Sequence, residues 1–136
     1  MPLAHFGLHV LVVEDNGTNR KLIAAQLEKL GCRCTMASDG EEALAALEQE
    51  PLPDVILMDC DMPVLDGWEA TRRIRGWAGE PSATTLQRHA SAIPIVALTA
   101  ATLPEERNRC FEVGMNRYLA KPIKLAHLQH VLQSLG

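Results

Sequence analysis

Aromatic residues are scarce in this chain of 136 residues, which has two Trp, one Tyr and two Phe. Its hydrophobic core must therefore consist mainly of Leu, Ile, Val, Ala and Met side chains. No apolar stretch approaches the roughly 20 residues that cross a bilayer as a helix. The first ten residues also lack the charged segment and the long apolar run of a signal peptide. We therefore expect this domain to lie in the cytoplasm, without membrane contact.

Concentrated positive charge is also missing. The net charge is −4 and no run of Lys and Arg stands out. Binding to a nucleic-acid backbone needs a concentrated basic face, so we expect no direct contact with nucleic acid. The four cysteines lack the C-x2-C pairs with matched partners that zinc sites use. We expect reduced thiols in a cytosolic protein; the cysteines are Cys32, Cys34, Cys60 and Cys110.

Five short apolar runs alternate with amphipathic segments along the chain. This alternation predicts an α/β, doubly wound (βα)5 fold, in which helices cover both faces of a five-stranded parallel sheet. We expect the flavodoxin-like strand order 2-1-3-4-5. The expected strands are residues 9–13, 32–37, 54–59, 93–100 and 117–120. The expected helices are residues 18–30, 40–49, 66–78, 104–113 and 124–135.

Local signals mark several ends of these elements. Asp66 is expected to cap the third helix at its N-terminus. Gly31 is expected to end the first helix in a left-handed conformation. Leu22 and Ile23 begin the helically spaced stripe of that first helix. Residues 79–92 are rich in Gly, Pro, Ser, Thr and Ala, and we expect them to form a surface loop.

Polar side chains mark the carboxyl ends of four expected strands. Glu14 and Asp15 follow the first strand, and Asp59 ends the third. Thr99 lies near the end of the fourth strand, and Lys121 follows the fifth. In an open parallel sheet, ligands bind beyond these carboxyl ends. If the strand order is 2-1-3-4-5, the first and third strands are neighbours and their three carboxylates meet.

Three carboxylates in one pocket repel one another unless they share a proton or bind a cation. A cluster with oxygen ligands alone suits Mg²⁺, or Mn²⁺ in its place. Lys121 adds a positive charge and Thr99 a hydroxyl group. Each residue alone is readily explained as a cap or a surface charge. Their joint occurrence at one sheet edge favours phosphoryl transfer to an Asp, since these groups neutralise the phosphoryl oxygens while the carboxylate attacks.

Several motifs resemble the receiver domain family of two-component signalling. They are LVVEDNGTNR (11–20), ASDGEEAL (37–44), VILMDCDMPVLDGWEATRRIR (55–75), IPIVALTA (93–100) and GMNRYLAKPI (114–123). The motifs are most similar to receivers of hybrid sensor histidine kinases, so we expect this chain to be part of such a protein or a stand-alone regulator. The resemblance implies a single receiver domain over residues 8–136, preceded by an N-terminal linker or tail at residues 1–7.

The resemblance also implies a metal site. Asp59 would be the phosphoacceptor and a ligand of Mg²⁺. Asp15 would bind the ion directly, and Glu14 would act partly through water. The main-chain carbonyl of Asp61 would be the remaining protein ligand.

A conformational switch is implied in the same way. Thr99 would hydrogen-bond the phosphoryl group and Lys121 would pair with it. Tyr118 resembles the switch aromatic of the family, whose rotamer follows Thr99. The Lys121–Pro122 peptide bond would be cis, and the small side chain of Ala100 would leave the phosphoryl group accessible.

The implied function is that of a signalling domain that accepts a phosphoryl group from a phosphohistidine. The donor would be a histidine kinase or a histidine phosphotransfer domain. Taken alone, the domain would not be an enzyme, although it would catalyse its own phosphorylation and dephosphorylation. The parent chain could be a histidine kinase, with this domain as the cytoplasmic part of a membrane-anchored sensor.

The main alternative is a phosphatase of the haloacid-dehalogenase type, with Asp59 and Asp61 as its paired carboxylates. In that family the pair closes the first strand, whereas here Glu14 and Asp15 come before it. Further acidic residues should follow the Lys, and residues 122–136 contain none. A flavin binder is disfavoured because the carboxylates would repel a flavin phosphate. A receiver that no longer takes phosphate is disfavoured because all the required residues are present.

Overall fold

A parallel sheet organises the part of the chain that the computed structural model describes, namely residues 6–60, 62, 64–100 and 104–135. Its strand order is β2-β1-β3-β4-β5, which confirms the predicted arrangement. The strands are β1 (His9–Val13), β2 (Arg33–Ala37), β3 (Val55–Asp59), β4 (Ile95–Thr99) and β5 (Arg117–Ala120). Strands β3 and β4 are buried along their whole length, as expected for parallel strands covered on both faces.

Helices follow the strands along the described chain. They are α1 (Gly17–Lys29), α2 (Gly40–Ala46), α3 (Gly67–Gly76), the short 3₁₀ helix η1 (Trp77–Gly79), α4 (Thr85–Ala90), α5 (Pro104–Glu112) and α6 (Leu125–Leu135). Within the described residues, no helix combines the length and the apolar character needed to cross a bilayer.

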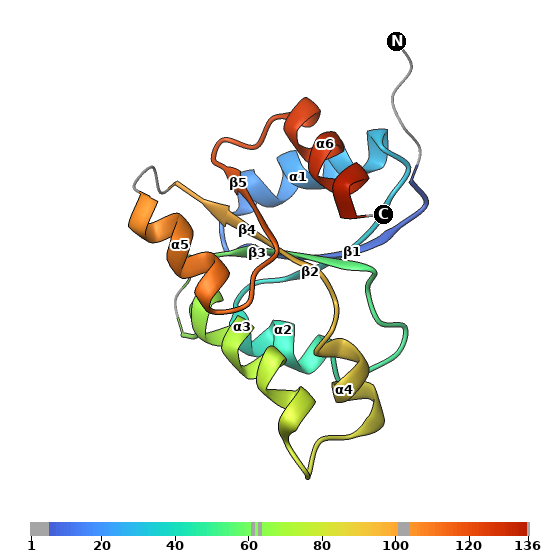
Figure 1. Cartoon of the computed structure of the whole chain (residues 1–136). Coiled ribbons are helices and arrows are strands. Elements are labelled where there is room, and N and C mark those ends of the chain that lie inside the picture. Colours follow the sequence, from blue (N-terminus) through green and yellow to red (C-terminus); the bar gives the residue numbers. More distant parts are fainter. Residues whose placement is uncertain (1–5, 61, 63, 101–103, 136) are drawn as a thin grey trace.

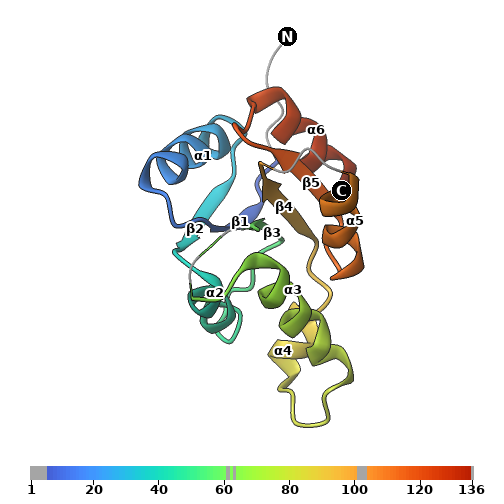
Figure 2. The same cartoon turned by 90° about the vertical axis from the view of Figure 1, so that its left-hand side faces the viewer.

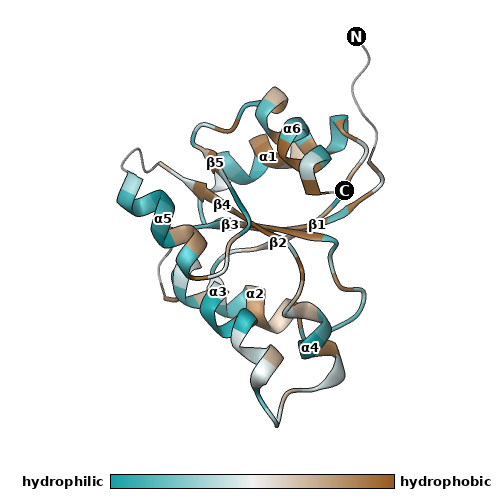
Figure 3. Cartoon of the chain, viewed as in Figure 1, coloured by the Kyte–Doolittle hydropathy of each residue, from teal (hydrophilic) through white to brown (hydrophobic). Residues whose placement is uncertain are grey.

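The helices cover both faces of the sheet. Helices α1 and α6 lie on one face, and α2 and α3 lie on the other (Figure 1, Figure 2). Leu27 of α1 and Leu128 of α6 belong to one buried cluster, whereas Ala43 of α2 and Ile74 of α3 belong to the other. The central strands β1, β3 and β4 are the most consistently hydrophobic part of the fold (Figure 3). The core is therefore two layers that share one sheet, which holds the strand ends in a fixed arrangement.

Side chains fix the starts of three helices beside the sheet. Asn16, Asp39 and Asp66 each accept a hydrogen bond from the backbone N–H three residues further on, at 2.8–3.0 Å. Such N-caps satisfy donors that have no partner within the helix. Gly31 has a φ of 71°, the left-handed conformation that ends a helix. The predicted roles of Asp66 and Gly31 are confirmed.

Arg75 joins helix α3 to the loops around β4 and β5. Its guanidinium donates to the carbonyl oxygens of Ser91, Ile93 and Gly114, and to Oδ1 of Asn116, over 2.7–2.9 Å. Partial burial lowers the pKa of Arg75 from its usual value. Its side chain therefore crosslinks segments that are far apart in the sequence.

The prediction of a loop over residues 79–92 is wrong in part. Residues 85–90 form helix α4, which begins with a capping box. The Thr84 side chain accepts from the Gln87 N–H, and the Gln87 side chain accepts from the Thr84 N–H. This reciprocal pair satisfies two backbone donors and stabilises a short helix in a polar segment.

Two further features differ from, or add to, the expected pattern. Leu22 is 42% exposed, although it belongs to the helically spaced stripe of α1, whereas Ile23 is buried. Residues 6 and 7 of the expected tail contact the domain, because the Phe6 N–H donates to Leu30 O and the Gly7 N–H to Gly31 O. The boundary at residue 8 stays a prediction.

Candidate functional site

The carboxyl ends of β1, β3, β4 and β5 meet at one edge of the sheet. Strand register places Asp59 beside Leu98, one residue before Thr99. It also pairs Thr99 with Ala120, one residue before Lys121. The Lys121 N–H continues this ladder with a 2.9 Å hydrogen bond to Thr99 O. The backbone pairing of β3, β4 and β5 therefore brings the predicted site residues Asp59, Thr99 and Lys121 to the same edge of the sheet.

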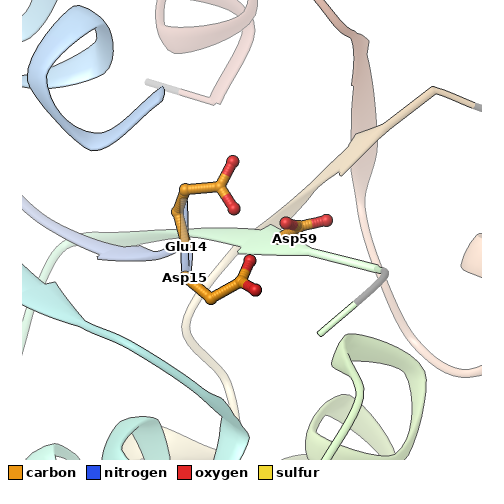
Figure 4. Close-up of side chains that lie close together, drawn as sticks. All are labelled: Glu14, Asp15 and Asp59. Carbon is orange, nitrogen blue, oxygen red and sulfur yellow. The ribbon is translucent and has the colours of Figure 1, made fainter. Parts of the chain in front are cut away.

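Three carboxylates converge at this edge. Each of Glu14, Asp15 and Asp59 offers an oxygen, and these oxygens all lie within 4.8 Å of one another. Figure 4 shows the side chains of Glu14 and Asp15 extending from the end of β1 toward Asp59. Glu14 and Asp59 are buried, with 0% and 1% exposure, whereas Asp15 is exposed. The cluster is open to solvent on the side of Asp15.

Gly67 supports the backbone of Asp59 from helix α3. Its N–H donates a 3.3 Å hydrogen bond to the carbonyl oxygen of Cys60. A Cβ atom at this position would overlap the carbonyl oxygen of Asp59. Close packing of α3 against the end of β3 therefore requires glycine at position 67.

Lys121 links two of the carboxylates. Its Nζ lies 2.9 Å from Asp59 Oδ2 and 3.3 Å from Glu14 Oε1. Burial on its own would lower the pKa of Lys121, but its bonds to Asp59 and the charges of Asp59 and Glu14 outweigh burial and raise it. The ammonium group is therefore charged and offsets part of the repulsion between the carboxylates.

Glu14 remains ionised in spite of its burial. Burial alone would raise its pKa, but the charge of Lys121 and the hydrogen bonds from Asn19 and Lys121 outweigh burial and hold the pKa below its usual value. Its Oε2 atom has no hydrogen-bond partner among the described residues. A buried carboxylate oxygen without a partner is costly, and a cation would satisfy it.

The donor set fits a hard cation. It consists of carboxylate oxygens, and Mg²⁺ takes one or two carboxylates while it keeps several waters. The unpartnered Oε2 of Glu14 and the exposure of Asp15 are consistent with such a site. Asp61, whose carbonyl was predicted as a further ligand, lies outside the described residues.

The predicted switch residues occupy β4 and β5. Thr99 closes β4 and is 1% exposed. Tyr118 pairs with Ala97 in the sheet and is half-buried. Its ring makes an edge contact with the ring of Phe111, with centroids 6.4 Å apart, and Arg107 lies 5.0 Å above it. The role of Tyr118 as a switch stays a prediction.

The loops at the site contain two unusual backbone features. The Lys121–Pro122 bond is cis, as predicted. Val64, in the loop between β3 and α3, has a φ of 68° and is 80% exposed. A β-branched residue in this region is strained, and such strain concentrates at functional sites. Ala100 is exposed beside Thr99, and its role in leaving the phosphoryl group accessible stays a prediction.

Asn19 is a site residue that the strand-end argument missed. Its Nδ2 donates a 2.9 Å hydrogen bond to Glu14 Oε1. Residue 19 lies in the first turn of α1, immediately after the loop that leaves β1. A polar side chain in the first turn after an acidic strand end is the signal that could have identified it.

Comparison with protein families agrees with this geometry. The profile of the response regulator receiver domain matches residues 10–133, nearly the whole chain. The chain therefore belongs to the response regulator receiver domain family. Membership confirms the resemblance inferred from the motifs and disfavours the phosphatase alternative.

Within this family, the chain is similar to receiver domains of sensor histidine kinases. It is 39% identical over 123 residues to the sensor histidine kinase RcsC of Salmonella typhi, a match that covers 90% of this chain but 12% of that protein. The receiver domain of sensor histidine kinase PA1611 of Pseudomonas aeruginosa, solved with magnesium in its active-site cleft, is 45% identical. It superposes with a TM-score of 0.80 over 96% of this chain and 98% of that chain.

A second solved structure contains a signalling complex. It is the co-crystal structure of the Saccharomyces cerevisiae histidine phosphotransfer protein Ypd1 with the receiver domain of Ssk1. The matched chain is 32% identical, with a TM-score of 0.80 over 99% of this chain and 90% of that chain. The similarity to receivers of sensor histidine kinases is thus supported by sequence and by structure.

Proposed function

We propose that this domain accepts a phosphoryl group from a partner phosphohistidine onto Asp59. An oxygen of the Asp59 carboxylate attacks phosphorus and forms the new P–O bond, while the P–N bond breaks and its electron pair returns to the imidazole. The observation that carries the proposal is the position of Asp59. Its buried carboxylate lies 2.9 Å from Lys121 and in one cluster with Glu14 and Asp15.

The residues that would hold the metal are Glu14, Asp15, Asp59 and the carbonyl group of Asp61. Mg²⁺ bound there, or Mn²⁺ in its place, would supply positive charge to the phosphoryl oxygens. Asp15 offers its carboxylate from the exposed side of the cluster. Glu14 offers the buried oxygen that lacks a hydrogen-bond partner among the described residues.

Lys121 and Thr99 would bind the oxygens of the new phosphoryl group. The Nζ of Lys121 already contacts Asp59, so a short movement brings it to a phosphoryl oxygen. The hydroxyl of Thr99 would donate to another oxygen, and Tyr118 on the adjoining strand would change rotamer. The phosphoryl group carries a charge of about −1.5 to −2, in place of the single charge of the Asp59 carboxylate. This extra negative charge and the new acceptor oxygens would then shift the region between residues 100 and 120 and alter a binding face. Hydrolysis of the acyl phosphate by the same site would reset it.

The partner would be a histidine kinase or a histidine phosphotransfer domain. The matched chain in the complex of Ypd1 with Ssk1 supports a partner of this kind. Exposed Leu22 lines a small pocket together with Glu14 and Lys121, and so offers apolar contact beside the acidic cluster. We propose a cytoplasmic domain of a hybrid kinase without direct nucleic-acid or membrane contact. The activity of the whole parent protein belongs to this proposal, because the chain spans 12% of RcsC.

A small phosphodonor tests the proposal without the partner. Incubation with acetyl phosphate and Mg²⁺ should add one phosphoryl group to the intact protein, measured by mass spectrometry. Asp59→Asn should abolish this addition. Asp54→Asn is the matched control, since Asp54 is an exposed residue just before the opposite end of β3. Addition that persists in Asp59→Asn would exclude Asp59 as the acceptor, and turnover of a phosphomonoester would instead support a phosphatase.

A further inference from the structure

Asn19 is the uncharged member of the two side chains that hold the Glu14 carboxylate. Its Nδ2 donates to Glu14 Oε1 at 2.9 Å, and Lys121 Nζ lies 3.3 Å from the same oxygen. The second oxygen, Oε2, has no hydrogen-bond partner among the described residues. Both contacts therefore fix one oxygen of Glu14 and leave the other available for a cation.

Asn19 lies on helix α1, which buried Ile23 holds against the sheet. The backbone N–H of Asn19 also donates a 3.0 Å hydrogen bond to Asn16 Oδ1, the N-cap of α1. Glu14 is fully buried, and its backbone N–H donates to Ala37 O of the neighbouring strand β2. The Asn19–Glu14 bond thus joins a capped helix to a strand end that is held in the sheet. Such outer contacts orient metal ligands.

Lys121 differs from Asn19 because it contacts two carboxylates. It bridges Glu14 and Asp59, so a phosphoryl group on Asp59 competes with Glu14 for its ammonium. Asn19 carries no charge, so the charge of the phosphoryl group does not attract it as it attracts the ammonium of Lys121. Its hydrogen bond to Glu14 can therefore persist when Lys121 turns toward the phosphoryl oxygens.

We infer that Asn19 is a positioning residue of the metal site, which holds Glu14 in the orientation that binds Mg²⁺ whether or not Lys121 contacts it. The inference rests on the proposed function for the location of the metal. It predicts that the loss of the Asn19 side chain weakens Mg²⁺ binding more when Asp59 carries a phosphoryl group than when it does not.

The test is a Mg²⁺ titration of the metal-free protein, followed by the fluorescence of Trp68 in a Trp77→Phe background. Asn19→Ala should raise the Kd for Mg²⁺ about 10-fold, the lower end of the effect of losing an outer partner of a metal ligand. Asn19→Asp should raise it further, since it replaces the donor with a second carboxylate beside Glu14. Asn19→Gln retains an amide and should recover part of the affinity. The loss in Asn19→Ala should grow when beryllofluoride, a mimic of the phosphoryl group, is present.

Asn16→Ala is the matched control, because it removes the helix cap and leaves the Glu14 contact in place. It should lower the Tm yet keep the Kd within twofold of the wild-type value. Equal loss of Mg²⁺ affinity in Asn16→Ala and Asn19→Ala would overturn the inference, as would an unchanged Kd in Asn19→Ala. If the wild-type protein itself bound no Mg²⁺, the proposed function would fail and the inference with it.

Discussion

Lys121 and Asp59 lie 62 positions apart in the sequence, yet Lys121 Nζ donates a 2.9 Å hydrogen bond to Asp59 Oδ2. The bond joins the ends of β5 and β3, between which β4 lies. The Lys121 side chain is 24% exposed, so its ammonium is neither fully solvated nor sealed in the core. The ammonium can thus neutralise the Asp59 carboxylate before phosphorylation and move toward the phosphoryl oxygens after it.

Mg²⁺ should stabilise the folded protein. A ligand that binds the folded state alone adds about 2.7 kcal/mol at a concentration of 100 times its Kd. The cation also relieves repulsion among the three carboxylates. Differential scanning calorimetry should show a Tm that rises with Mg²⁺ in the wild-type protein and hardly changes in Asp15→Asn. Glu28→Gln, near the far end of α1, should retain the Mg²⁺ response; the same loss there would point to an unspecific effect of charge.

Gly67→Ala should damage both stability and labelling. The new Cβ would overlap the carbonyl oxygen of Asp59, and overpacking of this kind costs about 1–3 kcal/mol. Urea unfolding should report the loss, and the yield of phosphorylation should fall because Asp59 is displaced. Gly76→Ala in the same helix has nothing within 4 Å of the added Cβ, and at this helical position it should raise stability by about 0.4–1 kcal/mol. Equal changes in stability and labelling at the two glycines would argue against the close approach of Gly67 to the carbonyl oxygen of Asp59.

Arg75→Ala should destabilise the fold by about 2–3 kcal/mol, because it leaves carbonyl groups without their charged donor. Arg72→Ala is a control on the same helix. Its side chain is 53% exposed, and its ion pair with Glu69 should contribute no more than about 0.5 kcal/mol. Urea unfolding of both variants gives the comparison. A small effect at Arg75 would show that water replaces its hydrogen bonds.

Tyr118 should report the switched state directly. It is the one tyrosine of the chain, so its ring signals can be assigned without ambiguity by NMR with labelled tyrosine. Addition of Mg²⁺ and beryllofluoride should shift these signals as the ring leaves its contact with Phe111. Thr99→Val, which lacks the hydroxyl group, should lose the shift, and Thr99→Ser should keep it. Unchanged ring signals in the wild-type protein would remove Tyr118 from the switch.

The sequence predicted the positions of Asp59 and Lys121 well, for a topological reason. Strands that alternate with helices form a parallel sheet, and parallel strands bring their carboxyl ends to one edge. The residue that ends each strand is then at the site whatever the details of packing. Strand order and the locations of Glu14 and Asp15 followed from the same argument.

Features that depend on the rotation of a helix could not be predicted in this way. The stripe of α1 does not reveal that Leu22 is exposed while Ile23 is buried, because the packing of α1 on the sheet sets the rotation. The bond from Asn19 to Glu14 depends on the same rotation. Helix α4 was missed for a different reason: its capping box at Thr84 and Gln87 is a local signal within a segment of loop-like composition.

The identity of the phosphoacceptor is tested most directly by trapping the acyl phosphate. The protein would be treated with acetyl phosphate and Mg²⁺ and then with borohydride, which reduces an aspartyl phosphate to homoserine. Peptide mass spectrometry would then locate the homoserine. We expect it at position 59 and at no other aspartate. Homoserine at position 15 or 61, or phosphoryl incorporation that leaves Asp59 unreduced, would contradict the assignment of Asp59 as the nucleophile.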